Sequence, residues 1–171
     1  GVVKTNSTYP CNGPESQPIR CTHHHNSPVA LYEAIENSCN PYFWETFKDM
    51  FASSRFASSK EAYQYWYDMV TSFGLGSMFK TDIPSEMAGN IPKSAFYDKM
   101  YRGVWNAMTI RSLSIGQGEI LVTPLQLANM AVAIGNEGYY YPPHLIKSFN
   151  DGTPIDSIMT TKKVIDIEKQ H

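Results

Sequence analysis

The first 27 residues constrain the fold most strongly, because they cannot build a hydrophobic core of their own. They are rich in Pro, Asn, Ser and Gly and show no apolar periodicity. Such a composition buries too little apolar surface to offset the entropy lost when a chain becomes ordered. We therefore expect residues 1–27 to form a loop that is ordered only if something cross-links it. Cys11, Cys21 and the run His23, His24 and His25 are the candidates for that role.

The remaining residues can supply one core. A chain of 171 residues suits a single domain, and its 42% hydrophobic and 18% charged content is typical of globular proteins. The formal charge of −2 gives no electrostatic reason to expect nucleic acid as a partner. No run approaches the ~20 apolar residues of a membrane span, and no signal peptide is visible. The sequence therefore predicts a soluble domain, or the soluble part of a longer protein.

Apolar spacing predicts that most of residues 28–135 are helical. Asn40 followed by Pro41 is typical of a helix start, with the Asn40 amide as the cap. Ser58 and Glu61 have the spacing of a capping box. The expected helices run from Ser27 to Ile35, from Pro41 to Phe51, from Ser58 to Phe73, from Ala95 to Arg102 and from Thr123 to Gly135, with a loop at residues 74–93.

The helix that begins at Thr123 has the clearest start in the chain. Thr123 can cap it, Pro124 suits its first turn, and Gln126 can reach back to the cap. We expect its buried face to consist of apolar side chains, namely Leu121, Leu125, Ala128, Ala131 and Val132. Residues 139–149 then read as extended chain before a turn at 150–152. The prediction is a mainly helical chain with one β segment near its end.

Five stretches, in this order, resemble the transpeptidase domain of class B penicillin-binding proteins, most closely the penicillin-binding protein 2 group. They are Ala34–Phe43, Phe73–Gly76 with Thr81–Glu86, Ser114–Gly118, Val122–Ala128, and Asn136–Gly138 with Pro142–Leu145. The resemblance implies the α+β serine β-lactamase/transpeptidase-like fold, of which this chain would be a mainly α, helical subdomain. It also implies a D,D-transpeptidase that cross-links peptidoglycan stem peptides through a serine acyl-enzyme and is inhibited by β-lactams.

Enzymes of this family carry three motifs, S-x-x-K, S-x-N or S-x-D, and K-[ST]-G, and the middle one is Ser38-Cys39-Asn40. The resemblance implies that Ser38 relays a proton to the leaving D-alanine amine. It implies that Asn40 contacts the lysine of S-x-x-K and orients the bound peptide. The alternative interpretation is that Asn40 is only a helix cap.

The other motif-like runs do not fit the family pattern. Ser77–Lys80 spells S-x-x-K but follows Ser38 and lies in a predicted loop, whereas the chemistry needs Ser and Lys one helical turn apart. Lys80–Asp82 lacks the glycine of K-[ST]-G, and Ser148–Asn150 lies on the extended tail. We therefore expect residues 1–171 to be the middle portion of a transpeptidase domain, inactive alone. The nucleophile, the K-T-G strand and an N-terminal membrane anchor would lie elsewhere in a protein on the periplasmic side of the bacterial inner membrane.

The cysteines and histidines suit a zinc site, because thiolate and imidazole are the ligands that Zn²⁺ prefers. Some members of the family hold zinc near this position, and the corresponding set here is Cys11, Cys21, His25 and Cys39, with His23 as the second choice of histidine. A Cys11–Cys21 disulfide, with Cys39 free and the histidines solvated, is the alternative for an oxidising compartment.

Two functional hypotheses follow. In the first, the protein uses stem peptides and β-lactams as ligands and cell-wall synthesis proteins as partners. In the second, the chain is a zinc-stabilised helical interaction module without catalysis, whose aromatic residues, such as those of the run Tyr63–Tyr67, serve a partner.

Overall fold

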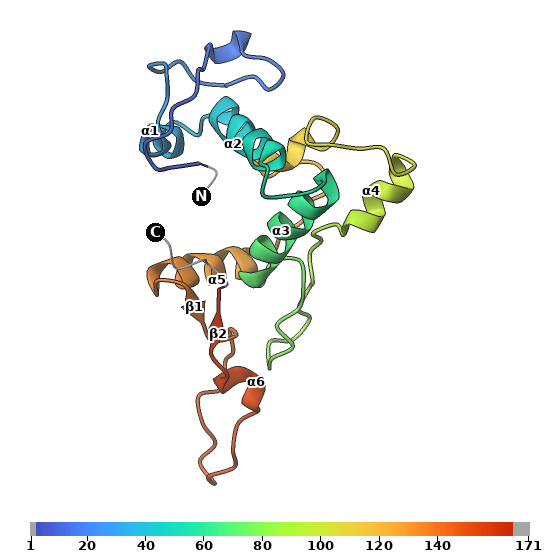
Figure 1. Cartoon of the computed structure of the whole chain (residues 1–171). Helices are drawn as coiled ribbons and strands as arrows, with labels where there is room; N and C mark the ends of the chain where they lie inside the picture. The colour runs from blue at the N-terminus through green and yellow to red at the C-terminus, as the bar shows by residue number, and fades with distance from the viewer. Residues whose placement is uncertain (1–2, 166–171) are drawn as a thin grey trace. The chain divides into compact units, whose positions relative to one another are not determined.

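A computed structural model describes residues 3–165 of the chain (Figure 1). Its helices are η1 Gly13–Glu15, α1 Leu31–Glu36, α2 Asn40–Ala52, α3 Ser59–Ser72, α4 Ser94–Met100, η2 Arg111–Ile115, α5 Pro124–Gly135 and α6 Ser157–Thr160. Strands β1 (Tyr139–Tyr140) and β2 (Lys163–Val164) form an antiparallel pair. The prediction of a mainly helical chain with a short β segment near its end is confirmed. Within the described residues, none of the helices has the length and apolar character needed to cross a membrane.

The chain divides into two compact units, which are described separately. The first unit consists of Gly1–Gln64 and Ser94–Gly118, and the second of Tyr65–Lys93 and Glu119–His171. The S-x-N run and all three cysteines belong to the first unit, whereas α5, the β segment and the predicted loop at residues 74–93 belong to the second.

In the first unit, α2 packs against α1 and against η2. Its front loop is irregular apart from η1, as predicted, and is attached at Tyr9. The backbone of Tyr9 forms two hydrogen bonds with that of Val29, of 3.0 and 2.8 Å, and its hydroxyl donates to Asp49 on α2 at 2.6 Å. The loop also contributes two cysteines to a buried cluster that consists of Cys11, Cys21, Val29, Ala34, Cys39 and Tyr42. The loop is therefore ordered by buried cysteines and by Tyr9 rather than by regular structure.

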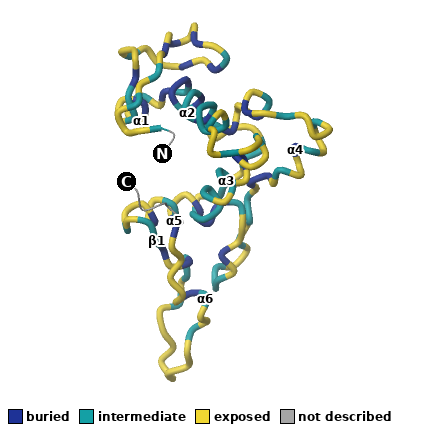
Figure 2. Tube along the Cα trace, in the orientation of Figure 1, coloured by how far each residue is buried: buried dark blue, intermediate teal, exposed yellow. Residues whose placement is uncertain are grey.

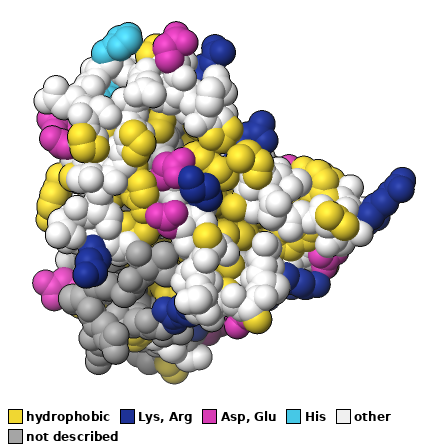
Figure 3. All heavy atoms as spheres, turned by 45° about the horizontal axis from the view of Figure 1, so that its top comes forward, with side chains coloured by type: hydrophobic (Ala, Val, Ile, Leu, Met, Phe, Trp, Pro, Cys, Tyr) yellow, Lys and Arg dark blue, Asp and Glu magenta, His cyan; other side chains and the backbone are white. Residues whose placement is uncertain are grey.

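The helix predicted from Ser27 starts later than expected, at Leu31. Val29 is the reason, because its N–H and C=O already pair with Tyr9 and are not available to a helix. The start of α3 agrees better with the sequence, since the Ser58 hydroxyl accepts a hydrogen bond from the Glu61 N–H at 3.2 Å. Apolar side chains are common on the face of the molecule shown in Figure 3. The exposed apolar residues of the first unit include Phe96, Met100, Val104 and Met108.

In the second unit, α5 packs against β1 and begins as the sequence predicts. The Thr123 hydroxyl accepts from the Gln126 N–H, and the Gln126 side chain accepts from the Thr123 N–H, both at 3.2 Å. The predicted apolar face, however, is wrong. Leu125 is half-buried, but the other four residues of that face are exposed, as much of the tube along α5 is in Figure 2. The buried residues of α5 are Gln126, Asn129 and Ala133.

The two buried amides of α5 bind the irregular segment at residues 73–88. Gln126 Nε2 donates to the carbonyls of Ser77 and Ala88 at 2.9 and 2.8 Å, and Asn129 Nδ2 donates to that of Phe73 at 2.8 Å. A segment without regular structure leaves carbonyls that need donors when they are buried. The polar face of α5 therefore holds this segment in place.

Replacing Gln126 with alanine should lower the free energy of unfolding by about 2–3 kcal/mol, because two carbonyls lose their donor. Leu127→Ala on the same helix is the matched control. Since Leu127 is 45% exposed, its replacement should cost only about 0.5 kcal/mol. Denaturant unfolding of both variants measures the difference. An equal loss in the two variants would contradict the assigned role of Gln126.

Candidate functional site

Ser38 lies in the turn that ends α1, with a left-handed backbone conformation. Its φ is +49°, its N–H donates to Ile35 O at 3.2 Å, and the Cys39 N–H donates to Ala34 O at 2.8 Å. These two bonds form a Schellman motif, whose left-handed position is usually occupied by glycine because a Cβ is strained there. A serine at this position costs about 1 kcal/mol. Residues held in such conformations cluster at functional sites.

The three residues of the S-x-N run have different surroundings. Ser38 is exposed, Cys39 is fully buried, and Asn40 is half-buried. Cys39 is the N-cap residue of α2, and Pro41 follows in its first turn. The turn therefore directs the Cys39 side chain into the core and leaves the Ser38 hydroxyl accessible to a ligand.

Asn40 does not cap the helix, and the interpretation of this residue as a cap is wrong. It is the first residue of α2, and its Nδ2 donates to the Arg20 carbonyl at 3.1 Å. This bond uses one of the two amide hydrogens. Within the described part of the chain, the second hydrogen and the Oδ1 atom are left for a ligand.

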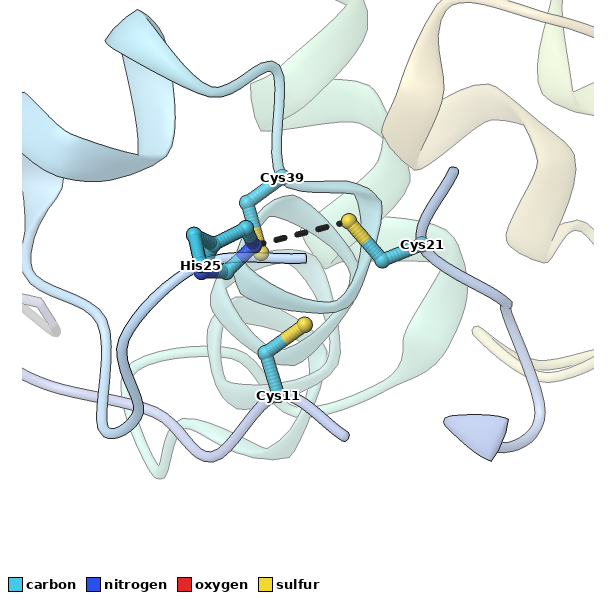
Figure 4. A group of neighbouring side chains, drawn as sticks. All are labelled: Cys11, Cys21, His25 and Cys39. Atoms are coloured by element: carbon cyan, nitrogen blue, oxygen red, sulfur yellow. Dashed lines mark hydrogen bonds between the residues drawn. The ribbon is translucent and has the colours of Figure 1, made fainter. Parts of the chain in front are cut away.

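The four side chains proposed as metal ligands lie together (Figure 4). One potential ligand atom from each of Cys11, Cys21, His25 and Cys39 lies within 4.8 Å of the others, and Cys21 Sγ is 3.5 Å from His25 Nε2. All three cysteines are free thiols. A tetrahedral zinc ion with bonds of about 2.3 Å to sulfur separates its ligand atoms by about 3.8 Å. The cluster therefore has the ligand types and the approximate spacing that zinc needs.

His25 is oriented for such a role by its other ring nitrogen. Nδ1 lies 2.9 Å from the Asn26 carbonyl, to which it can only donate, and this bond leaves the Nε2 lone pair directed at the cysteines. His23 and His24, in contrast, are exposed. The histidine that lies beside the three cysteines is therefore His25, the first choice among the three candidates.

The thiols of Cys39 and Cys11 have pKa values shifted in opposite directions. Burial raises the pKa of Cys39 to about 12. Burial also acts to raise the pKa of Cys11, but hydrogen bonds with the Gly13 N–H, the Ser16 hydroxyl and the thiols of Cys39 and Cys21 together outweigh it, so that this pKa is lowered. A bound cation would favour the thiolate of each cysteine, because it adds a positive charge beside the sulfur.

Sequence reasoning missed the backbone groups that orient this site. The Arg20 and Asn26 carbonyls have no signal in the sequence, because every residue carries a carbonyl. Ser16 was also missed; it is 6% exposed, and its hydroxyl lies 3.8 Å from Cys11 Sγ and accepts from the Asn12 N–H at 2.8 Å.

Ser77–Lys80 does not lie on a helix. The segment is irregular, Lys80 has a φ of +60°, and the Glu86 carboxylate accepts from the backbone N–H groups of Phe79 and Lys80 at 2.5 and 2.9 Å. Ser77 and Lys80 are therefore not placed one helical turn apart. Lys80–Asp82 and Ser148–Asn150 are also irregular.

Comparison with known proteins places this chain in a family. The family model described as "Penicillin binding protein transpeptidase domain" matches residues 1–171. The chain belongs to the penicillin-binding protein transpeptidase family. The resemblance to class B penicillin-binding proteins is thereby confirmed.

Individual relatives include Peptidoglycan D,D-transpeptidase MrdA of Acinetobacter baumannii. It is 29% identical to this chain over 126 residues, which are 74% of this chain and 17% of the relative. Penicillin-binding protein PbpB of Mycobacterium tuberculosis is 33% identical over 125 residues, 70% of this chain and 17% of the relative. The crystal structure of Pseudomonas aeruginosa PBP2 in complex with WCK 5153 has the same fold, with a TM-score of 0.71 and 24% identity over 99% of this chain and 37% of that one. The chain thus spans about a sixth of the length of these two curated relatives.

Proposed function

We propose that the chain is part of a peptidoglycan D,D-transpeptidase that cross-links stem peptides through a serine acyl-enzyme and is acylated by β-lactams. The observation that carries the proposal is the match of residues 1–171 to the transpeptidase family model, together with the S-x-N run in which Ser38 holds an exposed hydroxyl in the turn before α2. Asn40, two residues further on, adds an amide with unused hydrogen-bonding groups. The family match supports this assignment.

In the proposed reaction, the serine of an S-x-x-K motif attacks the carbonyl between the two terminal D-alanines of a stem peptide. The serine hydroxyl gives its proton to the motif lysine, an ester forms on the serine, the C–N bond breaks, and the departing D-alanine amine takes up a proton. The amine of a second stem peptide then attacks the ester, which forms the cross-link and releases the serine. Ser38 is suited to deliver the proton to the departing amine, because a hydroxyl can accept from one neighbour and donate to another. Asn40 is suited to hold the substrate through its second amide hydrogen and the motif lysine through Oδ1.

We place the nucleophile outside these 171 residues, because Ser77–Lys80 has neither the helical geometry nor the order in the chain that the motif needs. The protein would act on the periplasmic side of the inner membrane together with other cell-wall synthesis proteins. Its ligands would be stem peptides and β-lactams.

We further propose that Cys11, Cys21, His25 and Cys39 hold a structural zinc ion. The support is the ligand spacing and the Asn26 carbonyl that orients His25. When bound, the ion would cross-link a loop that has little apolar surface of its own, and it would tie that loop to α2 through Cys39. It would take no part in acyl transfer. Elemental analysis of protein purified without added zinc, together with a thiol count, tests the site. One zinc per chain is expected, and three reactive thiols without metal would contradict it.

A fluorescent penicillin tests the proposed function. The full-length protein should become covalently labelled, whereas residues 1–171 alone should not, because a proton relay without its nucleophile has nothing to act on. Labelling of the isolated chain would show that the nucleophile has been misplaced.

A further inference from the structure

We infer that Arg20 is a positioning residue for acyl transfer, whose carbonyl, held by the Cys/His cluster, fixes the orientation of the Asn40 amide. The Cys/His cluster here means Cys11, Cys21, His25 and Cys39. The inference rests on the proposed function and adds a link between the front loop and the S-x-N run. That link involves the backbone of Arg20 and not its side chain.

The contact that carries the inference is the 3.1 Å hydrogen bond from Asn40 Nδ2 to Arg20 O. An asparagine side chain can turn about its χ2 bond and exchange its oxygen for its nitrogen. A fixed carbonyl allows only the nitrogen to face it. The Arg20 carbonyl therefore decides which end of the Asn40 amide is presented to a ligand.

The position of that carbonyl depends on the Cys/His cluster. Arg20 directly precedes Cys21, which is 1% exposed and lies 3.5 Å from His25 Nε2. Asn40 directly follows Cys39, which is 0% exposed. The donor and the acceptor of the bond are thus each one residue away from a buried cluster cysteine. A second tie holds the loop beside Arg20, because the Cys21 N–H donates to Gly13 O at 3.1 Å.

If the Arg20 carbonyl orients residue 40, aspartate at this position should slow acylation in this chain, although other members of the family carry S-x-D. A carboxylate at that position has no proton to donate at neutral pH, and one of its oxygens would face the Arg20 carbonyl at hydrogen-bond distance. Two acceptors in contact repel each other, so the side chain would rotate away from the substrate. Alanine, in contrast, only loses the bond.

The first experiment measures acylation of the full-length protein by a fluorescent penicillin as a function of its concentration. The amplitude of labelling reports the folded fraction, and the maximal rate reports the geometry of the site. Asn40→Asp should keep the amplitude and lower the maximal rate at least about 10-fold, which corresponds to the loss of one hydrogen bond. A maximal rate within about threefold of the parent would overturn the inference, since this is less than such a bond is worth.

Thermal unfolding provides a second readout, independent of activity. Asn40→Ala should melt below the parent, because the Arg20 carbonyl loses its donor. If Asn40→Ala melts at the same temperature as the parent, the bond to the carbonyl does not hold this side chain.

A double-mutant cycle tests the link to the cluster. Cys21→Ser should lower the maximal acylation rate about 10-fold in the parent and by less than about twofold in the Asn40→Ala background, because the two residues act through one bond. If Cys21→Ser lowers the acylation rate by the same factor in the parent and in the Asn40→Ala background, the cluster does not act through the Asn40 bond. His23→Ala is the matched control in the same loop, because His23 is exposed and lies outside the cluster; it should leave the rate unchanged.

Failure of this inference can be distinguished from failure of the proposed function. If Ser38→Gly is acylated at the parent rate, the proposed function fails. If Ser38→Gly is slow but Cys21→Ser and Asn40→Ala act independently, only the role of the Arg20 carbonyl fails.

Discussion

Replacing Ser38 with glycine should slow acylation of the full-length protein by a penicillin about 100- to 10,000-fold, the range for loss of a general acid–base group. The same change should leave the protein at least as stable as the parent. Ser38 has a φ of +49°, a conformation that glycine adopts without the cost of a Cβ. We expect a gain of up to about 1 kcal/mol in the free energy of unfolding from relief of this strain, since a side chain costs that much in the left-handed region.

A variant that loses activity but gains stability distinguishes a catalytic role of Ser38 from a structural one. Ser38→Ala is the matched variant, because it also removes the hydroxyl but keeps the Cβ. It should be as slow as Ser38→Gly and less stable than that variant. The time course of labelling by a fluorescent penicillin gives the acylation rates, and denaturant unfolding gives the free energies of unfolding. If both variants lose stability together with activity, Ser38 has only a structural role in the turn.

Removal of the proposed zinc should have the largest effect on stability. A strong chelator, or Cys11→Ala, is expected to lower the free energy of unfolding by more than about 4 kcal/mol, because a structural metal contributes its binding energy to folding. The first unit should lose more than the second, since its buried cluster contains the three cysteines. Hydrogen exchange of the two units before and after chelation measures this difference.

The exposed His23 again supplies the control for the metal prediction. His23→Ala should retain one zinc per chain and the melting temperature of the parent. If the chelator leaves hydrogen exchange unchanged throughout residues 3–64, the cluster is a core of packed thiols and not a metal site.

Local signals in the sequence predicted the helix starts that depend on neighbouring residues alone. Thr123 and Gln126 form the expected reciprocal hydrogen bonds, and Ser58 caps α3. These features depend on residues three positions apart, so their chemistry can be read directly from the spacing. The irregular front loop was equally predictable, because its composition leaves too little apolar surface to bury.

Features that depend on distant backbone groups could not be predicted. Gln126 and Asn129 are buried because the carbonyls of residues 73, 77 and 88 need donors, and nothing in the α5 sequence indicates that need. The hydrogen bond of Asn40 could not be predicted for the same reason, since its partner is the carbonyl of Arg20. The sequence identified Asn40 as polar and well placed for a cap, whereas its actual partner lies twenty residues away along the chain.

The most direct test of the account is to map the penicillin adduct on the full-length protein by mass spectrometry, in the parent and in Ser38→Gly. We predict one adduct, on a serine that lies outside residues 1–171, formed rapidly in the parent and very slowly in the variant. An adduct on Ser77 or on any other serine within these residues, or equal rates in the two proteins, would contradict the account.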